Sequence, residues 1–326
     1  MTRRNLFLIG MLALQSLLLG ARWVGSDEGQ STGGGLLLPN LEIQRVRQVV
    51  VQKSGDDGER LTLKRQGTGW VVAEAFDYSA DGEKVEQALR DLSGLEIAHT
   101  VSSTEHHHRS LKVADDAYER RVTLKLEDGD QVGVLIGTSG RGGSVHARVF
   151  GETDVQSVRD YSPWRMTTSP TSWIDKTFFE VDAARVLALE VRTAEQQFAV
   201  DREGDVWTLR DAGPADPRKV EDLVGALDEI VLSGVESRRG DAKLGEHVAT
   251  ARFTLGAPAE GDEAAQSTPV DTRELALYAH PDEANTNLLV ETDSHVVEVP
   301  RWRVKALLDA DPTALRLATK GDDPAP

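Results

Sequence analysis

The sequence predicts an α+β fold made of two tandem repeats, each an antiparallel β-meander with one amphipathic helix (βββα) followed by about four antiparallel strands. Three observations predict this class. A tryptophan closes a short strand at Trp70 and again at Trp207. Each of these strands is followed by an Ala-Asp pair that opens an amphipathic helix, at Ala80 and at Ala215, an offset of 135 positions. A length of 326 residues is enough for about two domains of ordinary size.

Each repeat contains one helix with a single apolar face. Residues 80–95 and 215–230 align without gaps, and their apolar positions recur at i, i+3, i+4 and i+7. The matched pairs are Val85 with Val220, Ala88 with Leu223, Leu89 with Val224, Leu92 with Leu227 and Leu95 with Ile230. Asp81 is a suitable N-cap, and Pro217 opens the second helix, where its missing N–H costs nothing. We therefore expect both helices to pack through this face.

The composition excludes several classes of function. A net charge of −17 argues against a nucleic-acid partner, because phosphate binding needs clustered Lys and Arg. The absence of cysteine excludes disulfides, thiolate nucleophiles, Cys-based zinc sites and a lipid-modified N-terminal cysteine. The 39% apolar and 28% charged residues are typical of a chain with folded cores.

The N-terminus carries the pattern of an export signal or membrane anchor. Arg3 and Arg4 precede the apolar run Leu6–Gly20. Extended to Val24, the segment would span about 28 Å as a helix, close to the thickness of a bilayer core. We interpret residues 1–25 as a signal anchor that forms a transmembrane helix, which places the rest of the chain outside the cytoplasm of a bacterial inner membrane. A cleaved signal peptide and a buried core helix stay open as alternatives.

The first repeat is predicted at residues 41–170, after a flexible linker at residues 26–40 that is rich in Gly, Ser and acidic residues. Alternating apolar residues, separated by Gly- and Asp-rich turns, predict its strands. These strands are expected at residues 46–51, 59–64 and 69–72 before the helix, and at 122–126, 132–136, 145–150 and 155–158 after it.

The second repeat is predicted at residues 171–312, with a mobile insertion at residues 256–272 that is rich in Ala, Pro and acidic residues. A short amphipathic helix is expected near Trp302–Asp309, and residues 313–326 are predicted to be a disordered tail. Its strands are expected at residues 186–192, 197–201, 206–209, 250–255, 275–279, 288–291 and 296–299.

Two segments raise the question of a bound ion or phosphate. His106, His107 and His108 could contribute metal ligands, but consecutive side chains point in different directions, so we interpret the segment as a solvated linker. The loop Gly137–Ser144 could cradle a phosphate, but Gly143 stands where a P-loop requires Lys, and strands flank it on both sides. A hairpin connection is the better interpretation.

No motif predicts catalysis. The chain lacks a G-x-S-x-G nucleophile elbow. Asp175 and Lys176 beside Trp173 are interpreted as part of a connecting turn rather than an activated pair. Trp70 and Trp207 could stack on a sugar, but their matched positions favour a role in the core. The sequence therefore predicts no catalytic, cofactor-binding or metal-binding residue and no cofactor.

The chain resembles the DUF4340 family of bacterial membrane-anchored proteins. The resemblance rests on the N-terminal anchor, on the two strand-Trp-turn-helix units and on the sequence W-I-D-K at Trp173–Lys176. It implies a companion of gliding-motility-type ABC transport systems on the outer face of the inner membrane, and it supplies no catalytic residues.

Two functions are expected from these patterns. The first is a non-catalytic, membrane-anchored auxiliary or scaffold protein, with ABC transporter permease or auxiliary subunits as partners. The alternative is a periplasmic binding module for an envelope glycan or peptide. A metallohydrolase that uses the histidine segment is a more distant third.

Overall fold

The structure is a computed structural model that describes residues 34–55, 58–257 and 269–317. It consists mostly of antiparallel β-sheet with a few short helices, which confirms the predicted α+β class at that level. Within the described residues, no helix has both the length and the apolar character that a membrane crossing requires. The predicted anchor at residues 1–25 lies outside the described residues.

The first large sheet has nine strands in the order β4-β3-β2-β1-β8-β9-β10-β11-β5. The predicted meander and the later strands form a single sheet, because β1 pairs antiparallel with β8 and places Val49 opposite Leu124. The strands are β1 (Val46–Gln52), β2 (Arg60–Gln66), β3 (Gly69–Val72), β4 (Tyr78–Ser79), β5 (Ile97–Ser102), β8 (Arg120–Leu126), β9 (Gln131–Ser139), β10 (Val145–Val149) and β11 (Val155–Val158). Strand β5 was not among the predicted strands.

Helix α2 (Gly82–Ser93) forms where the repeat predicts it. The N–H of Lys84 donates to the Asp81 carboxylate at 3.0 Å, which confirms the predicted N-cap. All five positions of the predicted apolar face are buried. Leu95 lies beyond the last helical residue, so the helix is shorter than its apolar pattern.

The folded chain begins earlier than the sequence predicts. The linker prediction extended to residue 40, but Leu37 and Leu38 are each only 6% exposed. The Leu37 N–H donates to the Leu95 carbonyl at 2.8 Å, and Leu36 forms an isolated bridge with Glu96. The linker prediction is therefore wrong for these leucines, because burial against the chain after α2 outweighs the flexibility of the glycines before them.

A small hairpin, β6 (Val113–Ala114) and β7 (Ala117–Tyr118), packs close to β9 and β10. Val113 belongs to an apolar cluster with Leu135 and Val155. Arg148 is buried beneath this hairpin, where its Nε donates to the Val113 carbonyl at 2.7 Å. A buried cation thus fixes the position of an otherwise short hairpin.

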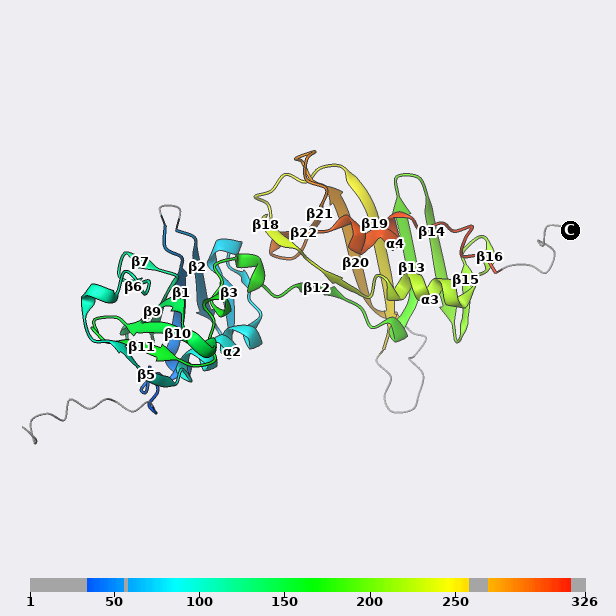
Figure 1. Ribbon diagram of the computed structural model, residues 1–326. Coiled ribbons are helices and arrows are strands. Elements are labelled where there is room, and N and C mark those ends of the chain that lie inside the picture. Colours follow the sequence, from blue (N-terminus) through cyan, green and yellow to red (C-terminus); the bar gives the residue numbers. More distant parts are fainter. Residues whose placement is uncertain (1–33, 56–57, 258–268, 318–326) are drawn as a thin grey trace, which may run out of the picture. The chain divides into compact units, whose positions relative to one another are not determined.

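The second large sheet also has nine strands, in the order β16-β15-β14-β13-β19-β20-β21-β22-β18. In Figure 1, β14, β13, β19 and β20 lie side by side. The strands are β13 (Val186–Thr193), β14 (Gln197–Glu203), β15 (Val206–Leu209), β16 (Gly213–Pro214), β18 (Gly234–Arg238), β19 (His247–Gly256), β20 (Pro269–Ala279), β21 (Leu288–Glu291) and β22 (His295–Val299). A separate pair consists of β12 (Thr177–Glu180) and β17 (Glu229–Val231).

Helix α3 (Pro217–Gly225) begins with Pro217, as predicted, and Asp216 is its N-cap, because the Arg218 N–H donates to the Asp216 carboxylate at 3.1 Å. It ends five residues before Ile230, the last residue of the predicted helix. Ile230 is still buried, but it lies in β17. The spacing of apolar residues therefore predicted burial correctly and helix length incorrectly, since the helix ends at Gly225 and the chain then turns into β17.

Two other predicted boundaries differ from the structure. Residues 269–272 were assigned to a mobile insertion, but they belong to β20 and pair with the end of β19. The tail was predicted from residue 313, but Leu315 is 7% exposed and the Leu317 N–H donates to the Pro214 carbonyl at 3.1 Å. Residues 258–268 and 318–326 lie outside the described residues.

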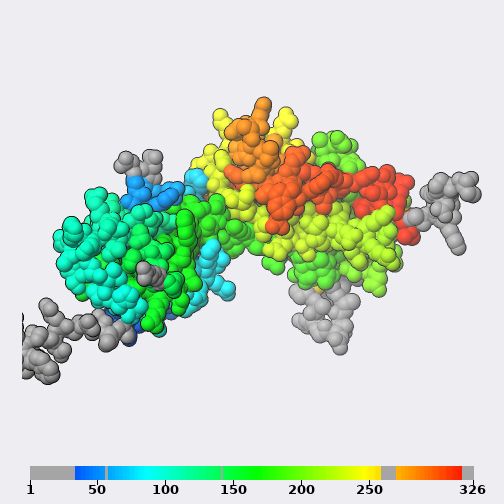
Figure 2. Space-filling view, in the orientation of Figure 1, coloured from blue at the N-terminus to red at the C-terminus, as the bar shows by residue number. Residues whose placement is uncertain are grey.

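The predicted C-terminal helix is a short 3-10 turn, η8 (Arg301–Val304), followed by α4 (Lys305–Leu308). Figure 2 shows this orange-to-red segment lying over the second sheet, and α4 contacts β19. The other 3-10 turns are η1 (Ile43–Arg45), η2 (Ala73–Ala75), η3 (Glu105–His107), η4 (Arg141–Gly143), η5 (Pro163–Arg165), η6 (Pro170–Ser172) and η7 (Ala183–Arg185).

Contacts divide the chain into two compact units. One contains the residues up to Leu61 together with Glu86–Thr168, and the other contains Thr62–Val85 together with Ser169 onward. The repeat boundary at residue 170 stays a prediction.

Candidate functional site

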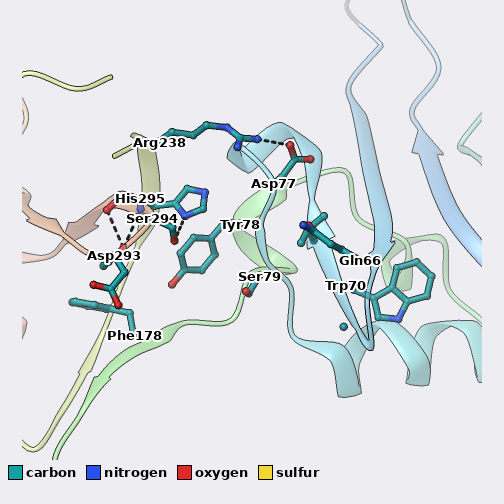
Figure 3. Close-up of a pocket in the computed structure, with 13 residues that line it drawn as sticks. Gln66, Trp70, Asp77, Tyr78, Ser79, Phe178, Arg238, Asp293, Ser294 and His295 are labelled. Atoms are coloured by element: carbon teal, nitrogen blue, oxygen red, sulfur yellow. Dashed lines mark hydrogen bonds and ion pairs between the residues drawn. The ribbon is translucent and has the colours of Figure 1, made fainter. Parts of the chain in front are cut away.

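The second unit contains a pocket of about 650 Å³ with both polar and aromatic walls (Figure 3). We call it the Tyr78 pocket. All of its lining residues belong to this unit. They come from β2 and β3, from the segment Asp77–Ser79, from β12 and β18, and from the turn between β21 and β22. The lining residues are Gln66, Gly69, Trp70, Val71, Asp77, Tyr78, Ser79, Phe178, Arg238, Thr292, Asp293, Ser294 and His295.

An unusual backbone turn presents Tyr78 to the pocket. Phe76 and Asp77 both have left-handed conformations, with φ of 60° and 59°. This left-handed conformation is disfavoured for a bulky L-residue such as Phe76. The Asp77 N–H holds the turn by donating to the Val72 carbonyl at 3.0 Å. Residues in such conformations cluster at functional sites. The turn therefore marks the Tyr78 pocket as the leading candidate.

His295 ties this turn to the opposite wall of the pocket. Its ring lies edge-on to Tyr78, with ring centroids 5.1 Å apart. Its Nε2 is 3.1 Å from the Phe76 carbonyl, which only accepts, so Nε2 carries a proton. In the neutral ring, Nδ1 then accepts from the Ser294 hydroxyl at 2.8 Å. Both ring nitrogens are thus engaged, and His295 is a buried link between two segments of the unit.

Ser294 and His295 do not complete a Ser-His-Asp arrangement. In such a triad a carboxylate accepts from the second ring nitrogen and stabilises the imidazolium that forms during catalysis. A neutral carbonyl, that of Phe76, occupies this position here. The carbonyl orients the ring and carries no negative charge that would stabilise an imidazolium.

The pocket lining contains an ion pair between Arg238 and Asp77 and a hydrogen-bond donor, the Tyr78 hydroxyl. Arg238 lies 2.5 Å from the Asp77 carboxylate, and Lys64 lies 3.1 Å from it. Burial, with a smaller contribution from the negative charge of Asp175, raises the pKa of Tyr78 to about 12. The Tyr78 hydroxyl, protonated at neutral pH as any tyrosine with its ordinary pKa of about 10 would be, can donate a hydrogen bond to a ligand.

Because of this raised pKa, we expect the folded chain to become less stable at strongly alkaline pH. The unfolded chain ionises Tyr78 near its ordinary pKa of about 10, whereas the folded chain ionises it at about 12. The contribution of Tyr78 to stability is therefore complete below the lower value and is lost as the pH rises through the upper one. We expect Tyr78→Phe to remove one late-titrating phenolate from the absorbance titration and to reduce this alkaline loss. If the phenolate that Tyr78→Phe removes from the titration were one that titrates at the ordinary value, this would contradict the prediction.

The three histidines at 106–108 do not converge. His107 Nδ1 lies 3.0 Å from the Ser102 hydroxyl, and His108 Nε2 lies 2.8 Å from the Thr153 carbonyl. His108 is only 7% exposed, so the interpretation of this segment as a solvated linker is wrong for that residue. The Thr153 carbonyl holds the ring in the folded unit, a contact that local sequence does not reveal.

The glycine-rich loop is a hairpin connection between β9 and β10, as predicted. The Gly140 N–H donates to the Ser144 carbonyl at 2.8 Å, and Gly142 and Gly143 have φ of 67° and 78°, which glycine adopts without strain. Asp175 and Lys176 also lie in a connecting segment. The Asp175 N–H donates to the Ser79 carbonyl at 2.9 Å, and the Lys176 carbonyl accepts from the Leu232 N–H at 2.9 Å.

His146, at the start of β10, is expected to make the folded chain less stable at acidic pH. Burial, followed by the neighbouring His99, lowers its pKa below the ordinary value. Its contribution is therefore present above about pH 6.5 and is lost as the pH falls, because the unfolded chain takes up the proton first. We expect a smaller free energy of unfolding at about pH 5 than at about pH 7. His146→Asn should reduce this difference, and an unchanged difference would contradict it.

Trp70 and Trp207 are buried, at 3% and 2% exposure, which confirms the predicted core role. Each ring lies under an arginine of the adjacent strand, Arg65 at 5.0 Å and Arg202 at 5.6 Å. Sequence reasoning missed Tyr78 and His295 as a pair. It also missed a cluster of Glu236, His280 and Glu298 in the second sheet. These residues are far apart in sequence and lie in no recognised motif.

Comparison with known proteins identifies one family. The model of a family described as "Domain of unknown function (DUF4340)" matches residues 70–246, which is more than half of the chain. No curated protein and no solved structure matches the chain.

Proposed function

We propose that this chain, which belongs to the DUF4340 family, is a non-catalytic binding module that holds an envelope glycan or peptide in the Tyr78 pocket. The observation that carries this proposal is the position of Tyr78, which lines a pocket of about 650 Å³ directly after the left-handed Phe76-Asp77 turn. Tyr78 offers an aromatic edge and a donor, while Asp293 and Ser294 add acceptors. Hydroxyl-rich and amide-rich ligands match such a wall.

Calorimetry with soluble peptidoglycan fragments tests this proposal. We expect saturable binding that Tyr78→Ala and Asp293→Asn each weaken by about tenfold or more, which corresponds to about 1.4 kcal/mol. Asp241→Asn is the matched control, because Asp241 is exposed and does not line the pocket. Glycan chains without peptide and peptides without glycan then identify the part that binds. Binding that survives both pocket variants, or no binding of any fragment, would refute the proposal.

A second candidate function is an anchored auxiliary or scaffold subunit of an ABC-type transport or gliding-motility-like system. It is supported by the apolar run Leu6–Gly20 with its preceding arginines, a pattern typical of an inner-membrane anchor, and by the association that the family resemblance implies. Purification of the full chain from membranes should recover a permease or auxiliary subunit. Recovery of no transporter subunit, with unchanged transport in a deletion strain, would exclude this role.

We also propose that the two large sheets are two copies of one repeated fold. Their strand orders correspond position by position, from β4 with β16 to β5 with β18. The N–H of each N-cap also donates to a carbonyl in a Pro-Thr segment, from Asp81 to Trp173 and from Asp216 to Leu315, both at 2.8 Å. These segments begin at Pro170 and at Pro312. In this proposal each copy ends with its Pro-Thr segment, which covers the start of its helix.

A further inference from the structure

Three side chains with metal-binding atoms meet at one end of the second sheet, outside the Tyr78 pocket. They are Glu236 in β18, His280 directly after β20, and Glu298 in β22 (Figure 1). One ligand atom from each lies within 4.8 Å of the other two. His280 Nε2 lies 3.8 Å from Glu236 Oε2. All three residues belong to the second unit.

A β-bulge positions one of the carboxylates. Strand β18 pairs with β22, with Gly234 opposite Glu298 and Val235 opposite Val297, and the register then shifts before Ser237. Glu236 is the additional residue at this shift. Bulges re-aim side chains and are frequent next to functional sites. The irregular register thus places Glu236 beside Glu298 at the edge of the sheet.

His280 presents an unsatisfied nitrogen to these carboxylates. Its side chain is 9% exposed, and its buried Nε2 has no hydrogen-bond partner among the described residues. Leaving a buried polar atom without a partner is costly. The other nitrogen, Nδ1, lies 3.3 Å from the Asp282 carbonyl and 3.0 Å from its N–H. The Asp282 N–H donates to Nδ1, which in the neutral ring leaves the proton on Nε2. A cation would bind Nε2 in the other tautomer, in which the proton lies on Nδ1 and faces the Asp282 carbonyl.

Asn287 supports the site from behind. Its side-chain amide donates to Glu298 Oε2 at 2.7 Å. Groups that orient a ligating carboxylate in this way are a usual part of metal sites. A plain ion pair explains the arrangement less well, because a protonated Nε2 would stand 3.8 Å from the carboxylate oxygen, beyond hydrogen-bond distance.

We propose that Glu236, His280 and Glu298 bind one divalent cation of the zinc type. One imidazole nitrogen and two carboxylate oxygens are accepted zinc ligands, with water completing four-coordination. Magnesium and calcium prefer oxygen ligands alone. Zinc distances require the three atoms to lie about 3.4 Å apart, so small side-chain rotations close the site from its present separations. The bound ion would join the edge strand β18 to the ends of β20 and β22.

The test uses the full chain purified without a histidine tag and freed of metal by a chelator. Titration calorimetry with zinc at neutral pH should show that one zinc ion binds per chain. Elemental analysis after dialysis should also find one zinc per chain. Magnesium or calcium in excess should not displace it. Cobalt in place of zinc should give the visible absorption of a four-coordinate site, which reports the geometry independently.

Variants separate this site from other acidic or histidine-containing surfaces. Glu236→Gln, Glu298→Gln and His280→Gln keep side-chain size and should each abolish stoichiometric binding. Asn287→Ala should weaken binding by about 10–100-fold, the usual effect of losing an orienting group. Glu246→Gln and His247→Gln are matched controls, because this Glu-His pair is exposed beside the same sheet. Circular dichroism verifies that each variant is folded.

Absence of zinc binding in the parent chain overturns the proposal. Binding that persists in the folded Glu236→Gln and His280→Gln variants overturns it as well, because the ion would then lie elsewhere. Loss of binding in these variants, with the controls unchanged, supports it.

Discussion

Trp207→Ala is expected to lower the free energy of unfolding of the second unit by about 3–5 kcal/mol, the usual cost of truncating a buried tryptophan. Trp207 is 2% exposed in β15, and its ring lies under Arg202 at 5.6 Å. The substitution removes the apolar area of the indole, the cation–π contact and the packing around the cavity that remains. Urea unfolding followed by circular dichroism measures the loss without relying on tryptophan fluorescence.

Two further variants make this result specific. Trp302 is 65% exposed, so Trp302→Ala should change stability by no more than about 0.5 kcal/mol. The Trp207 indole nitrogen has no hydrogen-bond partner among the described residues, so Trp207→Phe should lose volume but no hydrogen bond and cost less than Trp207→Ala. Hydrogen exchange should accelerate in β14 and β15 and stay unchanged in β8 and β9. Equal effects of Trp207→Ala and Trp302→Ala would contradict the assigned core role.

The parts of the fold that the sequence predicted are those specified by local patterns. Alternating apolar residues located β8 and β9, and the i, i+3, i+4 spacing with Pro217 at the first helical position located the start of α3. Such patterns report which side of an element is buried. They do not report where a helix ends when its apolar face continues into a strand, as happens between Gly225 and Ile230.

The parts that were missed depend on non-local pairing. Strand β5 contains half-exposed residues and exists as a strand through its pairing with β11, so its sequence carries little alternation. Pairing of β1 with β8, which unites the meander with the later strands, joins segments about 75 residues apart, a separation that propensity does not encode. Leu37 is buried where its N–H donates to the carbonyl of Leu95, a residue far from it in the sequence.

The candidate sites were missed for the same reason. Tyr78 and His295 are separated by more than two hundred residues, and neither lies in a recognised motif. The left-handed turn at Phe76 and Asp77 lies beside the site, but the sequence did not reveal it. Glycine and asparagine are the residues that usually mark such a turn, and neither is present in it. The conspicuous histidines at 106–108 drew attention, whereas His280, an isolated histidine, holds the unsatisfied nitrogen.

Arg148→Ala is expected to lower the free energy of unfolding of the first unit by about 2–4 kcal/mol, because it leaves two carbonyls without a donor. The Arg148 side chain is 5% exposed. Its Nε donates to the Val113 carbonyl at 2.7 Å, and another guanidinium nitrogen donates to the Glu152 carbonyl at 2.9 Å. Hydrogen exchange and urea unfolding should both report the loss, with the largest change in β6 and β7.

The ion pair of Arg148 with Asp115 contributes much less than these backbone contacts. Asp115 lies 2.6 Å from the guanidinium, but its side chain is 83% exposed, so solvent screens the attraction. Asp115→Ala should therefore cost no more than about 1 kcal/mol. Arg148→Lys keeps the charge but not the planar set of donors, so it should lose most of the stability that Arg148→Ala loses. If Asp115→Ala were as damaging as Arg148→Ala, charge pairing would hold the hairpin, and the hydrogen bonds to the two backbone carbonyls would not.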